Sequence, residues 1–125
     1  MTDRISPGTR AFDLPESLAV DVRLCAQGAS VTVRGDVDVH TAPLLRQRLL
    51  DVVSEGEERV VVHLDGVSFI DSTGLGVLVA ALKAQRAAGG SFELVCSAPR
   101  LLRLLELTRL DRVFTVHAGL PRTEP

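Results

Sequence analysis

Two stretches near the start of the chain alternate between apolar and polar residues. The first runs from Val20 to Leu24, the second continues through Val31 and Val33, and a short Gly-containing turn at 26–29 separates them. Alternation with a period of two predicts β-strands that have one face in water. Because the turn is short, the two strands are expected to pair as an antiparallel hairpin.

Three later segments have apolar residues at helical spacing. The first begins at Thr41, which can cap a helix, has Pro43 in its first turn and ends at Gly56. The second spans 72–88, and the third spans 99–110, beginning at a proline. The apolar stripe of each segment predicts a helix that packs on a sheet.

Short apolar runs separate these helices. The run Val60–Val62 is continuous and β-branched, which predicts a strand covered on both faces, and 91–97 and 112–117 indicate two further short strands. Strands that alternate with helices pair in parallel through right-handed crossovers. We therefore expect an α/β fold: a mixed, mostly parallel sheet with an N-terminal antiparallel hairpin and about three main helices.

A chain of 125 residues is suited to one domain with a sizeable core. Residues 1–16 are polar, contain two prolines and a glycine, and show no periodicity, so they are expected to form a flexible arm. Residues 118–125 are expected to be a frayed tail. The folded domain is thus predicted to occupy 17–117.

Composition weighs against several classes of function. The formal net charge is −2, the pI is near 5.9 and aromatic residues make up 3%, which argues against nucleic-acid binding. No apolar run approaches the roughly 20 residues that cross a bilayer, and the N-terminus lacks a signal-peptide core, so we expect a cytoplasmic protein without membrane contact. Cys25 and Cys96 lack metal-ligand spacing and are expected to be buried free thiols. We predict no metal and no cofactor.

Ser72 lies between an apolar strand and a helix, and three roles are open to it. As a helix N-cap it would contribute about 0.5–2 kcal/mol. A cap does not explain Gly74 and Gly76, since each glycine costs a helix up to about 1 kcal/mol relative to alanine. Two glycines here indicate that something approaches the backbone closely. The other two roles are attack on a substrate and acceptance of a phosphate.

An enzymatic role for Ser72 has little support in the sequence. The nucleophile elbow G-x-S-x-G is absent because Ile70 occupies the first glycine position. The three histidines, at 40, 63 and 117, do not form a recognisable triad pattern, and neither a dinucleotide fingerprint nor a P-loop is present. We expect no catalytic residues, although labelling of Ser72 by an activity-based serine probe would revive a serine-dependent enzyme.

Three motifs in order along the chain resemble one known family. "SFIDSTGLGVLV", preceded by "RGDVDVHTAPLLRQRL" and followed by "CSAPRLLRLLELTRLDRVF", resembles the STAS family and, within it, the bacterial anti-sigma factor antagonists. The resemblance covers roughly Leu18 to His117. It implies that Ser72 is phosphorylated by a partner that is both anti-sigma factor and serine kinase. It further implies that the unphosphorylated form binds this partner and frees a sigma factor, while a serine phosphatase resets the switch.

The same resemblance assigns roles to neighbouring residues. Asp38 falls where the family has an acidic residue close to the phosphorylated serine and to the partner surface. Thr73 could in principle accept the phosphate, but the family pattern puts it on the earlier hydroxyl. Without the resemblance, Asp38 and Asp71 would be interpreted as structural aspartates of loops and helix starts.

The helix after Ser72 carries a stripe of small side chains away from its leucine face. Gly76, Ala80, Lys83 and Ala87 make up this stripe, which suits docking by a partner although small residues also occur as surface filler. The full predicted partner-binding set is Asp38, Asp71, Thr73, Gly74, Gly76, Ala80 and Lys83.

The charge of a phosphate on Ser72 predicts how a switch would act. About −1.5 to −2 charges would be favoured by the helix N-terminus and opposed by the nearby aspartates, so the terms nearly cancel within the fold. At an interface, an unmatched buried charge costs several kcal/mol. Phosphorylation is therefore expected to abolish docking and leave the domain folded. The alternative is a STAS subunit of a signalling scaffold or a lipid-transport assembly, which only the identity of the partner distinguishes.

Overall fold

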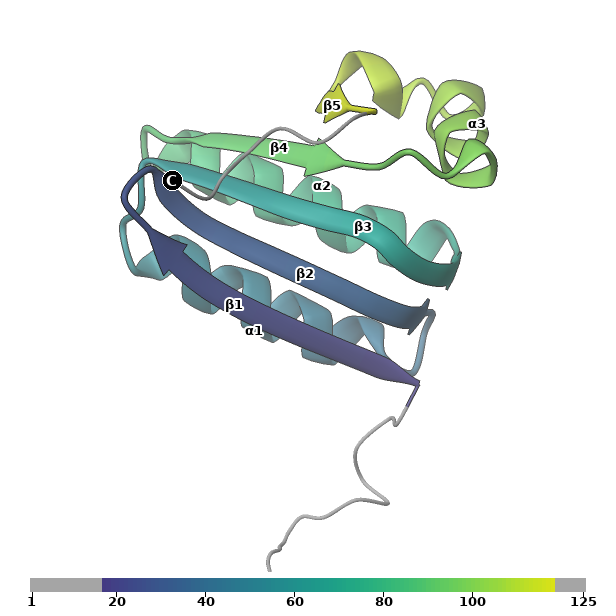
Figure 1. Ribbon diagram of the computed structural model, residues 1–125, viewed down its shortest axis with the longest axis horizontal. Helices are drawn as coiled ribbons and strands as arrows, with labels where there is room; N and C mark the ends of the chain where they lie inside the picture. Colours follow the sequence, from purple (N-terminus) through teal and green to yellow (C-terminus); the bar gives the residue numbers. More distant parts are fainter. Residues whose placement is uncertain (1–16, 119–125) are drawn as a thin grey trace, which may run out of the picture.

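The computed structural model describes residues 17–118, which form nine elements (Figure 1). The predicted arm 1–16, and the predicted tail 118–125 except its first residue, lie outside the described residues. In chain order the elements are β1 Leu18–Cys25, β2 Gly28–Val37, α1 Ala42–Ser54, β3 Arg59–Ile70, α2 Ser72–Ala87, β4 Ser91–Val95, α3 Pro99–Leu107, the 3₁₀ helix η1 Leu110–Arg112 and β5 Thr115–His117.

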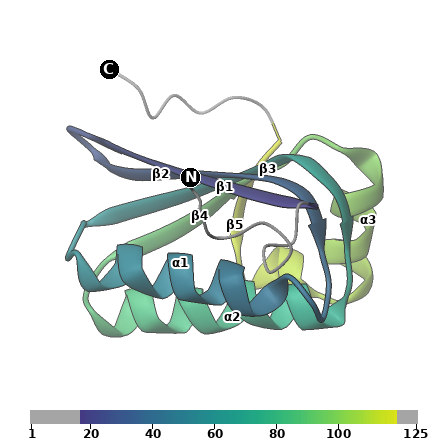
Figure 2. The same ribbon diagram turned by 90° about the horizontal axis from the view of Figure 1, so that it is seen from below.

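The five strands form one sheet in the order β1-β2-β3-β4-β5. β1 and β2 are antiparallel, and the other neighbouring strands are parallel. Each crossover steps in the same direction along the sheet, and right-handed crossovers of this kind put their helices on the same side. Figure 2 shows α1 and α2 side by side under one face. The predicted α/β class, the mixed sheet and the three main helices are confirmed.

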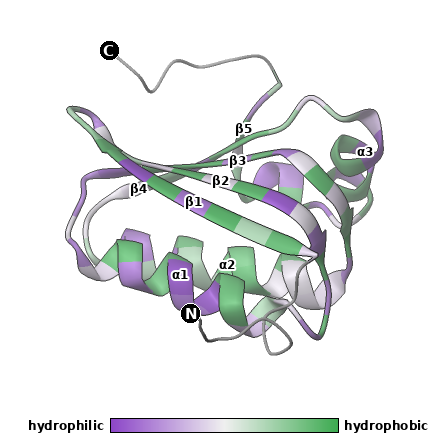
Figure 3. Cartoon of the chain, turned by 60° about the horizontal axis from the view of Figure 1, so that its bottom comes forward, coloured by the Kyte–Doolittle hydropathy of each residue, from purple (hydrophilic) through white to green (hydrophobic). Residues whose placement is uncertain are grey.

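The core lies between the sheet and the pair α1 and α2. Valines of β2 and β3 and leucines of the two helices fill it, and alternating hydrophobic and hydrophilic bands mark the strands (Figure 3). Val60 and Val62 point into this layer, and Val61, which has the opposite orientation, is only 1% exposed. The β-branched run is therefore buried on both faces, as its sequence predicts.

Helix α3 is shorter than the predicted segment 99–110. It ends at Leu107 because Thr108 turns its hydroxyl back to the Leu104 carbonyl, at 2.8 Å, and Arg109 takes a left-handed backbone with φ of 65°. Leu110 then belongs to η1, and the last strand is reduced to Thr115–His117. Apolar spacing alone did not reveal this break, since Leu107 fits the stripe and yet is 70% exposed.

The two cysteines differ in environment. Cys96 is buried, and burial raises the pKa of its thiol. Cys25 is half-buried at the end of β1, where its Sγ donates to the Gly28 carbonyl at 3.3 Å. The prediction of two buried thiols is thus correct for Cys96 and wrong for Cys25, because Cys25 lies with Asp21 and Arg23 on the face of the sheet opposite the core. Both are free thiols.

Candidate functional site

The site forms where two neighbouring parallel strands end. Val37 of β2 pairs with Ile70 of β3, so the residues that follow them meet at one edge of the sheet. The Asp71 N–H donates to the Val37 carbonyl at 3.2 Å and fixes the start of α2 beside the loop 38–41. This edge contains Asp38, Asp71 and Ser72.

Asp71, rather than Ser72, caps helix α2. Its backbone is extended, with φ of −113° and ψ of −172°, and its Oδ1 accepts the Gly74 N–H at 3.1 Å. Ser72 is the first residue inside the helix. The interpretation of Ser72 as N-cap is therefore wrong, because the strand bond of Asp71 to Val37 starts the helix one residue earlier. The Ser72 side chain is released from any capping role.

Both hydroxyl residues of this helix start lie on the surface. Ser72 and Thr73 are exposed, and neither hydroxyl forms a hydrogen bond within residues 17–118. A hydroxyl with these properties is accessible to the active site of a second protein. In the same part of the chain, no histidine bonds to Ser72 and no group of three or more His, Cys, Asp or Glu could hold a metal ion.

Asp38 organises the loop between β2 and α1. Its Oδ1 accepts the N–H of His40 at 2.9 Å and that of Thr41 at 3.1 Å. The hydrogen bond from the Thr41 N–H is the main reason that the pKa of the Asp38 carboxyl lies below its ordinary value, and the bond from the His40 N–H lowers this pKa further. The charge of Asp38 is thereby kept close to Asp71 and to the start of α2.

Thr41 occupies the N-cap position of α1 but makes no side-chain cap bond. Its Oγ1 instead accepts the Asp38 N–H at 2.9 Å and donates to the Asp36 carbonyl at 2.8 Å. The predicted capping by Thr41 is corrected accordingly: its buried hydroxyl joins the end of β2 to the loop. Loop 38–41 is thus fixed from both sides, and its Val39 and His40 are exposed.

The two glycines near the helix start have different environments. A Cβ on Gly74 would lie 2.5 Å from Val37 Cγ1 and 2.8 Å from Ile70 Cγ1, so glycine is required by packing inside the fold. Gly76 is exposed, and a Cβ there would meet nothing within 4 Å. The close approach inferred for Gly74 is therefore made by the protein's own core. Gly76 leaves bare backbone on the surface.

The predicted small-residue stripe lies on the outer side of α2. Gly76, Lys83 and Ala87 are exposed and Ala80 is half-buried, while the opposite side of the helix is buried against the core. The exposed members of the predicted partner-binding set therefore continue from Ser72 along one side of one helix. Gly74 lies beneath this surface.

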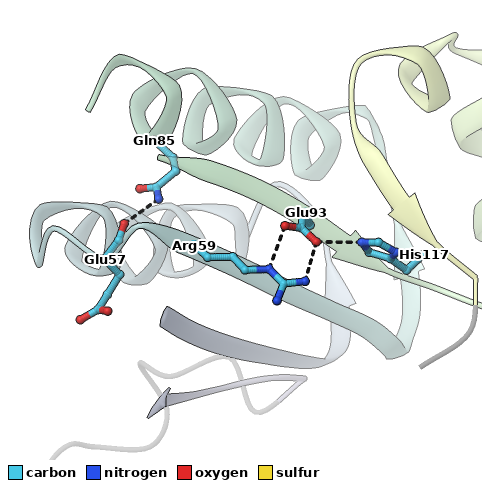
Figure 4. Close-up of polar contacts among 5 residues, drawn as sticks. All are labelled: Glu57, Arg59, Gln85, Glu93 and His117. Atoms are coloured by element: carbon cyan, nitrogen blue, oxygen red, sulfur yellow. Dashed lines mark hydrogen bonds and ion pairs between the residues drawn. The ribbon is translucent and has the colours of Figure 1, made fainter. Parts of the chain in front are cut away.

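The sequence reasoning missed an ionic cluster on the face of the sheet opposite α1 and α2. Glu93 of β4 accepts two hydrogen bonds from Arg59 of β3, both at 2.9 Å, and lies 2.7 Å from His117 Nε2 of β5 (Figure 4). The hydrogen bonds from Arg59 are the main reason that the pKa of the Glu93 carboxyl lies below its ordinary value. Because the partners are 34 and 24 residues away along the chain, only the strand register could have revealed the cluster.

A second missed feature is an apolar groove of about 370 Å³, whose lining on β3 ends at Ile70, two residues before Ser72. It lies between the end of β3, from Val67 to Ile70, and helix α3. Its lining includes two large exposed side chains, Phe69 and Leu107. Leu107 fits the apolar stripe of its helix, so its spacing alone gave no sign that it is exposed.

No helix in the described range 17–118 has the length and hydropathy needed to cross a bilayer. The features described at the carboxyl end of the strands are an exposed serine, a loop fixed by Asp38, the outer side of α2 and an apolar groove.

Comparison with known proteins gives consistent matches. The model of the STAS domain matches residues 22–121. The anti-sigma-B factor antagonist of Bacillus subtilis (strain 168) is 35% identical over 102 residues, which is 82% of this chain and 93% of that protein. The crystal structure of an anti-sigma factor antagonist from Mycobacterium paratuberculosis is 32% identical, with a TM-score of 0.77, and covers 86% of this chain and 91% of its own.

The same fold occurs in the Bacillus protein SpoIIAA, whose structure is known in a phosphorylated form. That structure has a TM-score of 0.60 and 19% identity, and the match covers 78% of this chain and 90% of SpoIIAA. At this identity the likeness concerns the fold alone.

Proposed function

Because the chain belongs to the STAS domain family, we propose that it is an anti-sigma factor antagonist switched by phosphorylation of Ser72. In its unphosphorylated form it binds an anti-sigma factor that is also a serine kinase, and a sigma factor is released. Transfer of a phosphate to Ser72 ends the binding, and a serine phosphatase restores it. The protein itself performs no catalysis.

One observation carries the proposal: Ser72 is the first residue of α2, is exposed, and has been relieved of capping by Asp71. A kinase needs a hydroxyl that it can enclose, and Ser72 can be reached without opening the fold. The two relatives described above are named as anti-sigma factor antagonists, which supports the same class of partner.

The proposed docking surface surrounds this serine. It comprises Asp38 from the loop, Thr73 beside the acceptor, and the outer side of α2 from Gly76 to Lys83. Bare backbone at Gly76 allows close approach of a partner, because a Cβ would have projected there into open space. Asp38 and Asp71 give the surface a negative edge.

Charge explains how the phosphate would end the binding. The group brings about −1.5 to −2 charges. The first turn of α2 favours it by about 0.3–2 kcal/mol, and Asp71, directly next to it, opposes it. Within the exposed surface these effects nearly balance. Under a partner, the same dianion would be desolvated next to two aspartates, and an unmatched buried charge costs several kcal/mol, which is a loss of affinity of two or more orders of magnitude.

A pull-down from the lysate of the native host tests the proposal, with the retained proteins identified by mass spectrometry. Wild type and Ser72→Ala are expected to retain an ATP-binding anti-sigma factor, and Ser72→Glu is expected to lose it. Circular dichroism must show that all three proteins remain folded. Retention of the same transporter or scaffold subunits by wild type and Ser72→Glu would contradict the antagonist role.

Phosphorylation by the captured partner tests the acceptor separately. With Mg-ATP, wild type and Thr73→Ala are expected to gain one phosphate, and Ser72→Ala none. Thr73→Ala is the matched control because it removes the neighbouring exposed hydroxyl from the same helix turn. A phosphate retained by Ser72→Ala and lost by Thr73→Ala would overturn the assignment to Ser72.

A further inference from the structure

The apolar groove between the end of β3 and α3 combines exposed apolar side chains with positively charged ones. Its floor is made by the end of β3 and by α3, and Phe69 and Leu107 remain 50% and 70% exposed. Large apolar side chains that gather in a groove mark a place where another segment binds. The full apolar lining consists of Val67, Phe69, Ile70, Ala98, Leu101, Leu104 and Leu107.

The charged residues of the groove are all basic. Arg100 and Arg103, both on the exposed side of α3, are the charged members of its lining, and the lining contains no carboxylate. A matching occupant therefore has apolar side chains with acidic groups next to them.

The segment 11–16 of this chain has this composition. Its sequence is AFDLPE, with Phe12 and Leu14 as apolar residues, Asp13 and Glu16 as acidic residues and no basic residue. Pro15 disfavours a helical backbone at the residue before it. In an extended segment, Phe12 and Leu14 share one side because they are two residues apart.

The point where the described chain begins is close to the groove. The Ser17 carbonyl accepts the Asp36 N–H at 2.8 Å, and Asp36 is the strand partner of Phe69. Ser17 is thus two strand spacings from Phe69, which is about 10 Å. Phe12 is five positions before Ser17, and five steps of an extended chain span up to about 17 Å. Phe12 can reach the groove without any change in β1.

We propose that residues 11–16 of this chain bind in the groove between the end of β3 and α3. Phe12 and Leu14 cover Phe69 and Leu107, and the acidic residues of the segment pair with Arg100 and Arg103. The contact is favoured by its intramolecular nature, since a short tether gives an effective concentration in the millimolar range. It is independent of the function proposed above.

The position of the groove gives the contact a consequence for binding. Ile70, part of the lining, is two residues before Ser72, so the docked segment would cover surface directly beside the proposed acceptor. A partner that used this end of β3 would have to displace residues 11–16 first. The segment would then act as a competitor for the same edge of the sheet.

Fluorine NMR of the full chain labelled with 4-fluorophenylalanine tests the proposal. The chain has four phenylalanines, of which Phe92 and Phe114 are buried controls. In wild type, the Phe12 and Phe69 signals are expected to be shielded from a dissolved gadolinium complex. Leu14→Ser is expected to increase the relaxation of both signals and leave Phe92 and Phe114 unchanged. Ile5→Ser, which removes an apolar side chain that precedes residues 11–16 in the sequence, is expected to have no effect.

Charge reversal provides a second, independent arm. Replacing Arg100 and Arg103 by glutamate is expected to release the segment, and adding Asp13→Arg and Glu16→Arg to that variant is expected to restore the shielding. Full relaxation of Phe12 in wild type, or a Phe69 signal indifferent to Leu14→Ser, would overturn the proposal. Shielding that depends on protein concentration, together with a dimer in sedimentation equilibrium, would overturn it in favour of a second copy.

Discussion

Asp38 and Asp71 occupy equivalent positions after two neighbouring parallel strands, and each uses its Oδ1 to accept backbone N–H groups. Asp38 accepts those of His40 and Thr41, and Asp71 accepts that of Gly74. Both aspartates therefore have a structural role, as their residue type alone indicates. Their negative charges nevertheless remain at the edge of the sheet where Ser72 is exposed. Each aspartate therefore both accepts local hydrogen bonds and contributes negative charge to the site.

The two roles of Asp38 can be separated by a pair of substitutions. Asp38→Asn keeps an Oδ1 acceptor and removes the charge, so the melting temperature is expected to stay close to that of wild type. Asp38→Ala removes the acceptor as well and is expected to melt at a lower temperature. Thermal unfolding measures the difference, and equal melting temperatures for the two variants would show that the loop bonds contribute nothing.

Binding of the captured anti-sigma factor gives the second readout for the same pair. If the charge of Asp38 contacts the partner, Asp38→Asn is expected to weaken binding although its fold is intact. Undiminished binding by Asp38→Asn would restrict Asp38 to the loop.

Gly74 and Gly76 are predicted to respond to alanine in opposite ways. Gly74→Ala forces a methyl group against Val37 and Ile70, and overpacking of this kind costs about 1–3 kcal/mol. Gly76→Ala adds a methyl group in open space within a helix and is expected to stabilise the fold by up to about 1 kcal/mol. Urea unfolding measures both values. A Gly74→Ala variant more stable than wild type would show that Val37 and Ile70 can move to accommodate the methyl group.

The ion pair of Glu93 with Arg59 predicts a loss of stability in acid. Because the folded pKa of Glu93 lies below the ordinary 4.5, its contribution is complete above that pH and is lost as the pH falls through the lowered value. Glu93→Gln is expected to lower the free energy of unfolding at pH 7 by about 1 kcal/mol, allowing for partial exposure. The variant should also lose less stability than wild type between pH 5 and pH 3.

A matched control for Glu93 is Glu106→Gln on the exposed side of α3. Urea unfolding at several pH values is expected to give a wild-type profile for this control. An unchanged acid profile in Glu93→Gln would contradict the assignment of the acid-sensitive group.

The two thiols are predicted to react at very different rates. Cys25 is half-buried at the hairpin tip, whereas Cys96 is buried with a raised pKa, which disfavours its reactive thiolate. Ellman's reagent is expected to label one thiol quickly and the second only when the protein is unfolded. Cys25→Ser should abolish the fast phase. A fast phase that persists in this variant would show that Cys96 is exposed by opening of the native fold.

Much of the fold follows from periodicity. The apolar spacing correctly predicted the order of strands and helices, because the two-residue and helical periods differ clearly in this chain. Details at the ends of elements could not be predicted in the same way. Asp71 and Ser72 are both good capping residues in adjacent positions, and the backbone bond of Asp71 to Val37, a contact between segments 34 residues apart, decides between them.

The candidate site shows the same limit. Exposure of Ser72 could be predicted because a helix start after a strand lies at the surface. The packing requirement of Gly74 could not be predicted, because it depends on Val37 and Ile70 at the ends of β2 and β3. The cluster around Glu93 could not be predicted either, because it depends on the register of β3, β4 and β5. The groove escaped prediction because apolar spacing does not distinguish an exposed apolar residue, such as Leu107, from a core residue.

The groove has two walls, the end of β3 and α3, and α3 is the wall that can move more easily because the strand that follows it, β5, is short. The three residues of β5 pair with β4 at the edge of the sheet and follow directly from η1 and α3. Elements with few backbone bonds open well below the free energy of global unfolding. Ser72, by contrast, begins a sixteen-residue helix packed on the central strands. Amide hydrogens of α3 and β5 should therefore exchange long before those of α2, so the groove can reshape while the phosphate acceptor stays in place.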